Sequence, residues 1–589
     1  MTNAPPPFLP PQAGEGLRVG APGAVTTARL ERATKVRFQT TLTPDTIRKY
    51  TGSGAWKDYP LLAAFDAALA RTPDKTAIVS PDGSRLTYAE TAAKAEAIAR
   101  NLQLVGIGAD DVISMQLPNC AEFILVHLAA LRLGAVTNPL LPNYRAKELS
   151  YILKFAGSKV CIIPDRYRGF DYLGMHGELR HSLPELRAVY VRGSNVGPGM
   201  LPFAELAKPR TGVSLPEPQT DCNRVTLLAF TSGTESTPKG VMHSENTMMY
   251  GTLTMARLLN LNADDVVWTP SPLAHATAFQ WGMRQAFTIG GTVVLQDIWD
   301  PLEGIKLIER ERCTYTLAAT PFAAMLLEHP QIDAHDLSSF RIFASAGAPI
   351  PEQLGNKFRD RIGCTLIGMW GMTECFVGSA SAADDRDDKL WLTDGKAMPG
   401  GGELAIFDET RTKMLPPGQP GELATRGPHV ALGYFNDPAR TENTFRKDGW
   451  LFSNDLATID AEGYIRIVGR MKDIINRGGI KISVREIEEM LLVHGAFSNV
   501  AVVAVPDARL GEKSCAFVIC HPGRSAALPD IVAYLESKGV AKYKLPEFFI
   551  PLREFPMTAS GKIQKFQLRE DFVQGKYAPA NPAANSKTA

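Results

Sequence analysis

Residues 230–241 read Phe-Thr-Ser-Gly-Thr-Glu-Ser-Thr-Pro-Lys-Gly-Val, and no other stretch of this 589-residue chain says more about its fold and chemistry. The apolar and β-branched residues 224–230 before it predict a buried strand. After it, Ser244-Glu-Asn-Thr and apolar residues at helical spacing predict a capped helix. A loop of Thr, Ser and Gly between such elements can turn its backbone N–H groups inward and hold an anion. We therefore expect a phosphate loop at residues 231–239, with a positive charge from Lys239.

Other meanings of this loop fit less well. A Walker A loop needs Gly-Lys followed by Ser or Thr, whereas Lys239 is followed by Gly240. Ser236-Thr-Pro-Lys matches the Ser-x-x-Lys pattern of penicillin-binding enzymes, but their Lys-Thr-Gly and Ser-Asp-Asn motifs do not occur. An ordinary flexible loop is the remaining alternative, and the length of the pattern between a strand and a helix argues against it.

Composition is typical of a soluble globular protein with several folding units. The length exceeds what one hydrophobic core covers, and 45% apolar and 21% charged residues are ordinary values. A formal net charge of +1 gives no reason to expect nucleic acid or an anionic membrane as a partner. Because no uninterrupted apolar run reaches about 18 residues, no transmembrane segment is expected.

The N-terminus and the cysteines indicate a cytoplasmic location. Residues 1–11 are rich in proline and lack the basic and apolar regions of a signal peptide. We expect disorder up to about residue 25. The eight cysteines form no Cys-x-x-Cys pair, so neither a disulfide framework nor a zinc site is expected.

Strand-like and helical patterns alternate between residues 58 and 470. This alternation predicts an α/β fold of stacked, mostly parallel sheets with helices on both faces. Active sites in such sheets gather beyond the carboxyl ends of the strands. Near Gly421, short strands and turns predict a small antiparallel, partly β-barrel-like subdomain. A compact α+β unit is expected after Arg470, with helices and strands at 484–494, 529–538, 500–505 and 514–520.

Three further segments carry residues suited to nucleotide chemistry. They are Gly368-Met-Trp-Gly-Met-Thr-Glu374, Trp450-Leu-Phe-Ser-Asn-Asp455 and Ser560-Gly-Lys-Ile-Gln-Lys565. Together with the phosphate loop, their order resembles the adenylate-forming superfamily of acyl-CoA synthetases, luciferases and peptide-synthetase adenylation domains. The resemblance covers at least six separated motifs over nearly the whole chain.

This resemblance implies a domain organisation and a reaction. Residues 55–470 would form the adenylation domain and 471–575 a small mobile C-terminal domain, with an N-terminal extension at 1–54 and a disordered tail at 576–589. A carboxylate attacks the α-phosphate of ATP, and the thiol of coenzyme A then displaces AMP from the acyl-adenylate. ATP, Mg²⁺ and coenzyme A are the implied cofactors. Because the carboxylate is already ionised at neutral pH, the enzyme acts by positioning and charge neutralisation.

The resemblance assigns most site residues to the nucleotide. Glu374 is expected to hold Mg²⁺ against the phosphates, and Thr373 to donate to the α-phosphate. Trp370 stands where the family usually has a Tyr stacked on adenine, with a merely buried Trp as the alternative. Asp455 is expected to accept both ribose hydroxyls. The full expected set is Thr231, Ser232, Gly233, Thr234, Lys239, Gly347, Ala348, Pro349, Trp370, Gly371, Thr373, Asp455 and Arg470.

One residue that differs from the family pattern, and two lysines, complete the residues expected to act in adenylation and domain rotation. Asn454 stands where many relatives have Gly, and Asn tolerates the left-handed backbone that Gly would adopt. Lys562 matches the lysine that catalyses adenylation. Thr231, Lys239 and Glu374 are the other residues expected to be catalytic. Lys472 matches the hinge of the C-terminal domain, with a solvated charge as the alternative. A lysine acetyltransferase acting on Lys562 and a homodimer are the macromolecular partners considered.

The resemblance places the acyl pocket along His275-Ala276-Thr-Ala-Phe279 and at Gly371. His275 stands where relatives have an aromatic gate residue, and a structural histidine is the alternative. No basic residue in these strings would bind a second carboxylate, so an apolar monocarboxylic acid fits best. Gly478 and Gly479 resemble the wall of the pantetheine tunnel of coenzyme A. Finer resemblance to short- and medium-chain acyl-CoA synthetases, including cyclohexanecarboxylate–CoA ligases, lies at 136–142, 509–516 and 541–547.

Two other functions stay open at this point. An aryl-CoA ligase, or an enzyme that loads a carrier protein, uses the same first step, although no carrier domain is visible. A catalytically inactive nucleotide-binding module belongs to a different class. The charges expected at an active site argue against it, since Lys239, Glu374, Asp455, Arg470 and Lys562 are all present.

Overall fold

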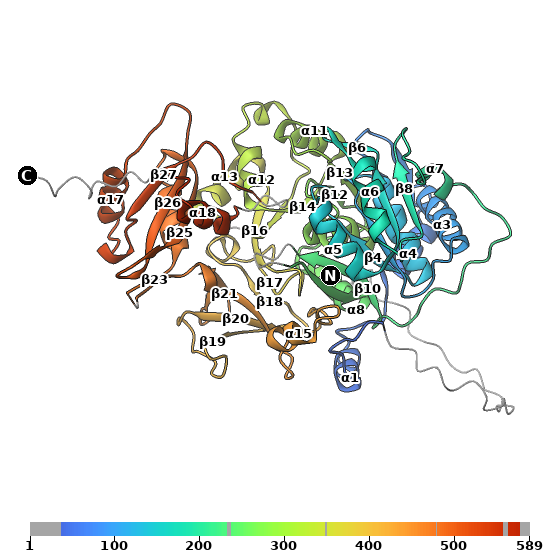
Figure 1. Cartoon of the computed structure of the whole chain (residues 1–589), viewed down its shortest axis with the longest axis horizontal. Helices are drawn as coiled ribbons and strands as arrows, with labels where there is room; N and C mark the ends of the chain where they lie inside the picture. Colours follow the sequence, from blue (N-terminus) through green and yellow to red (C-terminus); the bar gives the residue numbers. More distant parts are fainter. Residues whose placement is uncertain (1–36, 232–236, 348–349, 479, 558–562, 578–589) are drawn as a thin grey trace, which may run out of the picture. The chain divides into compact units, whose positions relative to one another are not determined.

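Two large, mostly parallel β-sheets and two smaller antiparallel or mixed ones organise the chain (Figure 1). The computed structural model describes residues 37–231, 237–347, 350–478, 480–557 and 563–577, and only the backbone of Lys472 and Lys481. All elements described below belong to the unit that begins at Phe38.

The largest sheet contains nine strands. They are β1 Thr76–Val79, β2 Arg85–Thr87, β12 Val266–Thr269, β13 Thr292–Leu295, β14 Tyr315–Ala318, β15 Ile342–Ser345, β16 Thr365–Trp370, β17 Ser379–Ala380 and β18 Lys396–Ala397. Their order is β18-β17-β16-β15-β14-β12-β13-β1-β2, and the six strands from β16 to β1 are parallel. The interior strands are apolar and almost entirely buried, as expected of parallel strands covered on both faces.

The second sheet contains seven strands and carries the phosphate loop. They are β3 Val112–Met115, β4 Val136–Pro139, β5 Ser158–Pro164, β8 Ala188–Arg192, β9 Leu201–Pro202, β10 Val225–Thr231 and β11 Lys239–Ser244. Their order is β11-β10-β4-β3-β5-β8-β9, parallel except for the antiparallel pair β10–β11. A separate hairpin joins β6 Arg166–Tyr167 to β7 Phe170–Asp171.

Helices surround these sheets (Figure 1). The α-helices are α1 Pro44–Gly52, α2 Leu61–Arg71, α3 Tyr88–Leu104, α4 Ala121–Leu133, α5 Ala146–Ala156, α6 Tyr172–Leu179, α7 Phe203–Leu206, α8 Glu245–Leu258, α9 Ala276–Ala278, α10 Gln285–Ile289, α11 Pro301–Glu311, α12 Thr320–Leu327, α13 Glu352–Ile362, α14 Asp387–Leu390 and α15 Pro438–Thr444. A π-helix, Phe279–Arg284, joins α9 to α10. The predicted cap of α8 is confirmed, because the Ser244 hydroxyl accepts from the backbone N–H of Thr247.

The surroundings of the phosphate loop differ from the predicted strand–loop–helix. Strand β11 lies between the loop and α8, so the loop connects two antiparallel strands. Besides its pairing with β10, this extra strand has hydrogen bonds to a distant segment: the backbone N–H groups of Leu432 and Phe435 donate to the carbonyls of Met242 and Gly240, both at 2.8 Å. Because the hydrogen bonds come from residues about 190 positions away, local sequence does not reveal them.

Two smaller sheets follow. The strands β19 Glu403–Phe407, β20 Gly421–Arg426, β21 Leu451–Ile459 and β22 Ile465–Arg470 form an antiparallel sheet in linear order. The predicted antiparallel character is confirmed, and the sheet pairs as an open row rather than a barrel. The C-terminal α+β unit contains β23 Ile475–Arg477, β24 Ile480–Ile482, α16 Val484–Leu492, β25 Phe497–Asp507, β26 Gly511–Cys520, α17 Leu528–Ser537, β27 Phe548–Pro551 and α18 Lys565–Val573.

The predicted fold class is therefore confirmed: large parallel sheets with helices, followed by a small α+β unit. The domain boundaries at residues 55, 470 and 575 and the mobility of the last domain stay predictions. Among the described residues, none of the helices combines the length and the apolar character that crossing a bilayer requires.

A buried histidine on α6 makes the stability of this fold depend on pH. The Nε2 of His176 lies 2.8 Å from Oε1 of Gln116, whose amide nitrogen already donates to the carbonyls of Leu141 and Tyr144. The Gln116 oxygen is therefore the acceptor, and the neutral His176 donates to it. Burial lowers the pKa of His176 from 6.5 to about 4.

We expect acid to destabilise the fold through His176. Between pH 6.5 and 4 the unfolded chain binds a proton at this residue and the folded chain does not, so stability falls as pH falls. The free energy of unfolding falls by at most about 1.4 kcal/mol for each pH unit, and the total loss between pH 7 and pH 5 is about 2 kcal/mol. Urea unfolding at pH 7 and pH 5 measures this loss of stability. Between these two pH values, His176→Gln should lose about 2 kcal/mol less unfolding free energy than the wild type. His181→Gln, at an exposed position, is the matched control; equal pH dependence in wild type and His176→Gln would contradict the assignment.

Candidate active site

The two ends of the phosphate loop face each other across a strand pair. Thr231 ends β10 and Lys239 begins β11, directly opposite in register. The Lys239 ammonium lies 5.3 Å from the ring centroid of Tyr434. Arg440, on α15, donates to the hydroxyl of Thr237 at 3.4 Å. The predicted phosphate donors Ser232, Gly233 and Thr234 lie outside the described residues.

Glu374 is buried beside the same tyrosine. The Tyr434 hydroxyl donates to Oε1 of Glu374 at 2.7 Å. Burial and the neighbouring Glu374 carboxylate raise the pKa of Tyr434, so the phenol stays protonated. Tyr434 thus contacts two of the predicted catalytic residues, Lys239 and Glu374. Sequence analysis missed it, because a Tyr after Ala-Leu-Gly looks like an ordinary core aromatic.

A tight turn presents Thr373 and Glu374. A Cβ at Gly371 would lie 2.0 Å from the carbonyl oxygen of Phe376, so the turn can close only over a glycine. Phe376 itself has a φ of 54°, a left-handed conformation that bulky residues adopt at a cost. His243 fixes the turn, because its Nε2 donates to the Thr373 carbonyl at 2.7 Å. Burial lowers the pKa of His243 to about 4, which keeps the ring neutral.

The expected ribose carboxylate is held on both sides. Oδ2 of Asp455 accepts from the indole N–H of Trp370 at 2.7 Å, and Oδ1 lies 2.8 Å from Nε of Arg470. Asp455 and Arg470 are register partners on β21 and β22, while Trp370 ends β16. Asn454 has a φ of 60°, so the predicted left-handed conformation is confirmed. The predicted trio thus comes together, and an Asp455–Trp370 hydrogen bond, which sequence analysis did not anticipate, joins two sheets.

The residues predicted for the acyl pocket lie near the π-helix. His275 caps α9, since its Nδ1 accepts from the backbone N–H of Thr277, and both His275 and Ala276 are half-buried. Phe279 is almost fully buried and packs its ring 4.8 Å from that of His127. Phe279 therefore belongs to the core in this structure. π-Helical turns inside helices are frequent at functional sites.

The remaining predicted residues are placed only in part. Gly347 has a φ of 85° and Gly478 a φ of 61°, both in the left-handed region that glycine favours. Lys472 lies in a short 3₁₀ turn, Met471–Asp473, directly after β22. Ala348, Pro349, Gly479 and Lys562 lie outside the described residues.

Comparisons with known proteins agree with this geometry. The chain matches the AMP-binding enzyme family over residues 65–435 and the AMP-binding enzyme C-terminal domain over residues 486–562. It is 38% identical over 528 residues to the medium-chain fatty-acid–CoA ligase of Escherichia coli (strain K12), covering 89% of this chain and 92% of the relative. The chain belongs to the AMP-binding enzyme family. The predicted enzyme class, an AMP-forming carboxylate–CoA ligase, is confirmed with it.

Relatives that act on aromatic acids are also similar to this AMP-binding enzyme. It is 32% identical to the 2,3-dihydroxybenzoate-AMP ligase of Bacillus subtilis (strain 168), covering 90% of this chain and 96% of the relative. The crystal structure of the anthranilate CoA ligase AuaEII in complex with anthranoyl-AMP superposes with a TM-score of 0.81 at 26% identity, covering 88% of this chain and 98% of that one.

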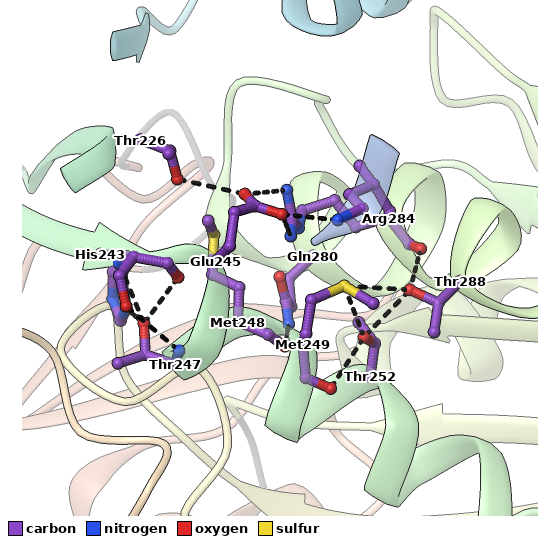
Figure 2. Close-up of polar contacts among 12 residues, drawn as sticks. Thr226, His243, Glu245, Thr247, Met248, Met249, Thr252, Gln280, Arg284 and Thr288 are labelled. Atoms are coloured by element: carbon purple, nitrogen blue, oxygen red, sulfur yellow. Dashed lines mark hydrogen bonds and ion pairs between the residues drawn. The ribbon is translucent and has the colours of Figure 1, made fainter. Parts of the chain in front are cut away.

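A buried ion pair connects the phosphate-loop strand to the π-helix (Figure 2). Glu245, the first residue of α8, receives two hydrogen bonds from Arg284 at 3.1 and 3.0 Å. It also accepts from the Thr226 hydroxyl on β10 and from the backbone N–H of Leu61 at the start of α2. The Arg284 side chain is fully buried. Sequence analysis missed this pair, although an Arg as the single charged residue of a mostly apolar segment, 276–289, was its signal.

Breaking this pair should cost the family fold much of its stability. Glu245→Gln leaves the buried Arg284 charge without a counter-ion, and we expect a loss of about 3–5 kcal/mol in unfolding free energy, measured by urea denaturation. The double variant Glu245→Gln/Arg284→Met removes the uncompensated charge and should recover part of the loss.

The surface pair Asp333–Arg361 offers the matched control. Its contacts are short but its side chains are exposed, so Asp333→Asn should barely shift the urea midpoint. If Glu245→Gln shifted the midpoint no more than Asp333→Asn, the buried pair would not stabilise the fold as described.

Proposed function

We propose that the chain is an acyl-CoA synthetase that activates an apolar monocarboxylic acid, of short to medium chain length or alicyclic, through an acyl-adenylate. One observation carries the substrate class: between His275 and Ile289 the single Arg or Lys is Arg284, and it forms a buried, bidentate ion pair with Glu245. A second carboxylate would therefore find no free arginine or lysine on this segment. The name of the 38% identical relative, a medium-chain fatty-acid–CoA ligase, supports the same class.

The nucleotide residues take the roles that their positions support. Lys239 and the phosphate loop face the phosphates. Each carboxylate oxygen of Asp455 forms one bond, to Trp370 or to Arg470, and keeps a second lone pair that can accept from a ribose hydroxyl. The indole ring of Trp370 stacks on the adenine.

Glu374 fits the expected magnesium ion. Tyr434 uses Oε1, while Oε2 makes no hydrogen bond to any of the described residues. One carboxylate oxygen is thus left for a hard cation, and Mg²⁺ commonly combines one or two carboxylates with substrate phosphates. When bound, the ion neutralises phosphate charge during the attack of the substrate carboxylate.

Chain-length dependence tests the substrate class. Each methylene that enters an apolar pocket contributes about 0.8 kcal/mol, so kcat/KM should rise about fourfold per carbon until the pocket is full. AMP release is measured with straight-chain acids of two to sixteen carbons, alicyclic acids and hydroxybenzoates, and the thioester is identified by mass spectrometry with coenzyme A present. Highest kcat/KM with dicarboxylates, amino acids, sixteen-carbon or aromatic acids would contradict the proposal. An acyl-adenylate that coenzyme A does not consume would favour carrier loading instead.

Separate assays of the half-reactions test the lysines. Lys562→Ala should slow pyrophosphate release by about 10²–10⁴ through loss of charge stabilisation, while thioester formation from supplied acyl-adenylate stays near wild type. Lys472→Pro should do the reverse, because fixing φ at the hinge hinders rotation. Acetylation of Lys562 removes the same charge and should abolish adenylation. Equal slowing of both steps by Lys562→Ala would mean either that the lysine is structural or that the domain does not alternate, and would contradict this mechanism.

A further inference from the structure

Tyr434 lies between the two charged residues that the reaction needs beside the phosphates. Its backbone pairs with Val241 of β11, two residues from Lys239. The backbone N–H of Ala431, three residues before it, donates to the carbonyl of Glu374 at 2.9 Å. The segment 431–435 is thus bonded to the phosphate-loop strand and to the turn that carries Glu374.

The side chain of Tyr434 contacts both charges through different parts. Its hydroxyl donates to Glu374, and its ring face lies 5.3 Å from the Lys239 ammonium, within the range of a cation–π contact. Phe445 packs against the ring at 5.3 Å in an edge arrangement, and Tyr434 itself is almost fully buried. The ring has little freedom to turn away, so both contacts are fixed.

Without this ring, opposite charges in a partly buried site would pair directly. Attraction between a carboxylate and an ammonium grows as water is excluded. Among the described residues, neither Lys239 nor Glu374 forms an ion pair, with each other or with a third group. The Tyr434 ring contacts the Lys239 ammonium, and its hydroxyl donates to Oε1 of Glu374. Oε2 of Glu374 stays available for a cation.

We propose that Tyr434 is a positioning residue that keeps Lys239 and Glu374 apart and aims the second Glu374 oxygen at the magnesium–nucleotide complex. The inference rests on the proposed function and deepens it, because it names the residue that keeps the metal-binding carboxylate from forming an ion pair with Lys239. Tyr434 acts through these two residues and is not itself placed on the substrate.

Magnesium-dependent ATP binding, measured by calorimetry, tests this role apart from catalysis. Tyr434→Phe keeps the ring and removes the hydroxyl, so ATP affinity without Mg²⁺ should stay within about twofold of wild type. The tightening of ATP binding by Mg²⁺ should fall by about tenfold or more, the usual scale of a lost hydrogen bond to a charged group. Tyr434→Leu also removes the ring and should weaken Mg²⁺-free binding several-fold as well.

Two controls separate positioning from general damage. Tyr250 is as buried as Tyr434, and its hydroxyl shares its proton between the backbone carbonyls of Met398 and Pro399. Tyr250→Phe should therefore leave the effect of Mg²⁺ on ATP binding at the wild-type value. In a Glu374→Gln background, Tyr434→Phe should cause no further loss of the Mg²⁺ effect, because the two substitutions remove the same function, the positioned carboxylate oxygen.

The outcomes also distinguish this inference from the proposed function. If the wild-type protein formed no acyl-adenylate from any of the acids tested, the proposed function would be wrong. Wild-type protein that does, together with Tyr434→Phe equal to wild type in its Mg²⁺ effect, would overturn the positioning role alone. Additive losses in the Glu374→Gln background, or an equal loss in Tyr250→Phe, would overturn it too.

Discussion

The buried ion pair between Glu245 and Arg284 is the contact on which the rest of the site depends. Removing two charges from water costs several kcal/mol per ion, and such a pair persists only where its geometry and further hydrogen bonds compensate. Here the contact is bidentate, and the carboxylate also accepts from β10 and from the start of α2. Four elements are thereby fixed to one another. Since β10 ends in Thr231 and the π-helix begins at Phe279, one pair sets the spacing between the phosphate loop and the segment expected to meet the acyl group.

Around this frame, backbone contacts rather than long side chains bring the charged groups together. The turn after β16 is closed by the Gly371–Phe376 contact, and the segment 431–435 is hydrogen-bonded to β11. Side chains then project over short, fixed paths. Preorganised groups of this kind lose little entropy when substrate binds, which is how charge neutralisation becomes effective in an enzyme.

Local patterns predicted the elements well, because their causes are local. The helices predicted at 484–494 and 529–538 correspond to α16 Val484–Leu492 and α17 Leu528–Ser537, and Ser244 caps α8 as its spacing to Thr247 indicates. The left-handed Asn454 follows from the conformational preference of one residue type. The family resemblance likewise placed Asp455 and Arg470 at the same nucleotide, and the structure brings the two side chains together. By contrast, the contacts of β11 with residues 432 and 435, the Tyr434–Glu374 hydrogen bond and the Glu245–Arg284 pair join residues dozens of positions or more apart, and no periodicity in the chain encodes such pairings.

The closed turn at Gly371 also limits how this enzyme can diverge. Even a methyl group at that position would collide with the Phe376 carbonyl, so no mutation there can reshape the neighbouring wall without rebuilding the turn that presents Glu374. His275 and Ala276, which we propose for the acyl pocket, are half-buried. Under the proposed function, a change of acyl substrate is expected to come from substitutions at these two positions, while the Gly371 turn stays unchanged.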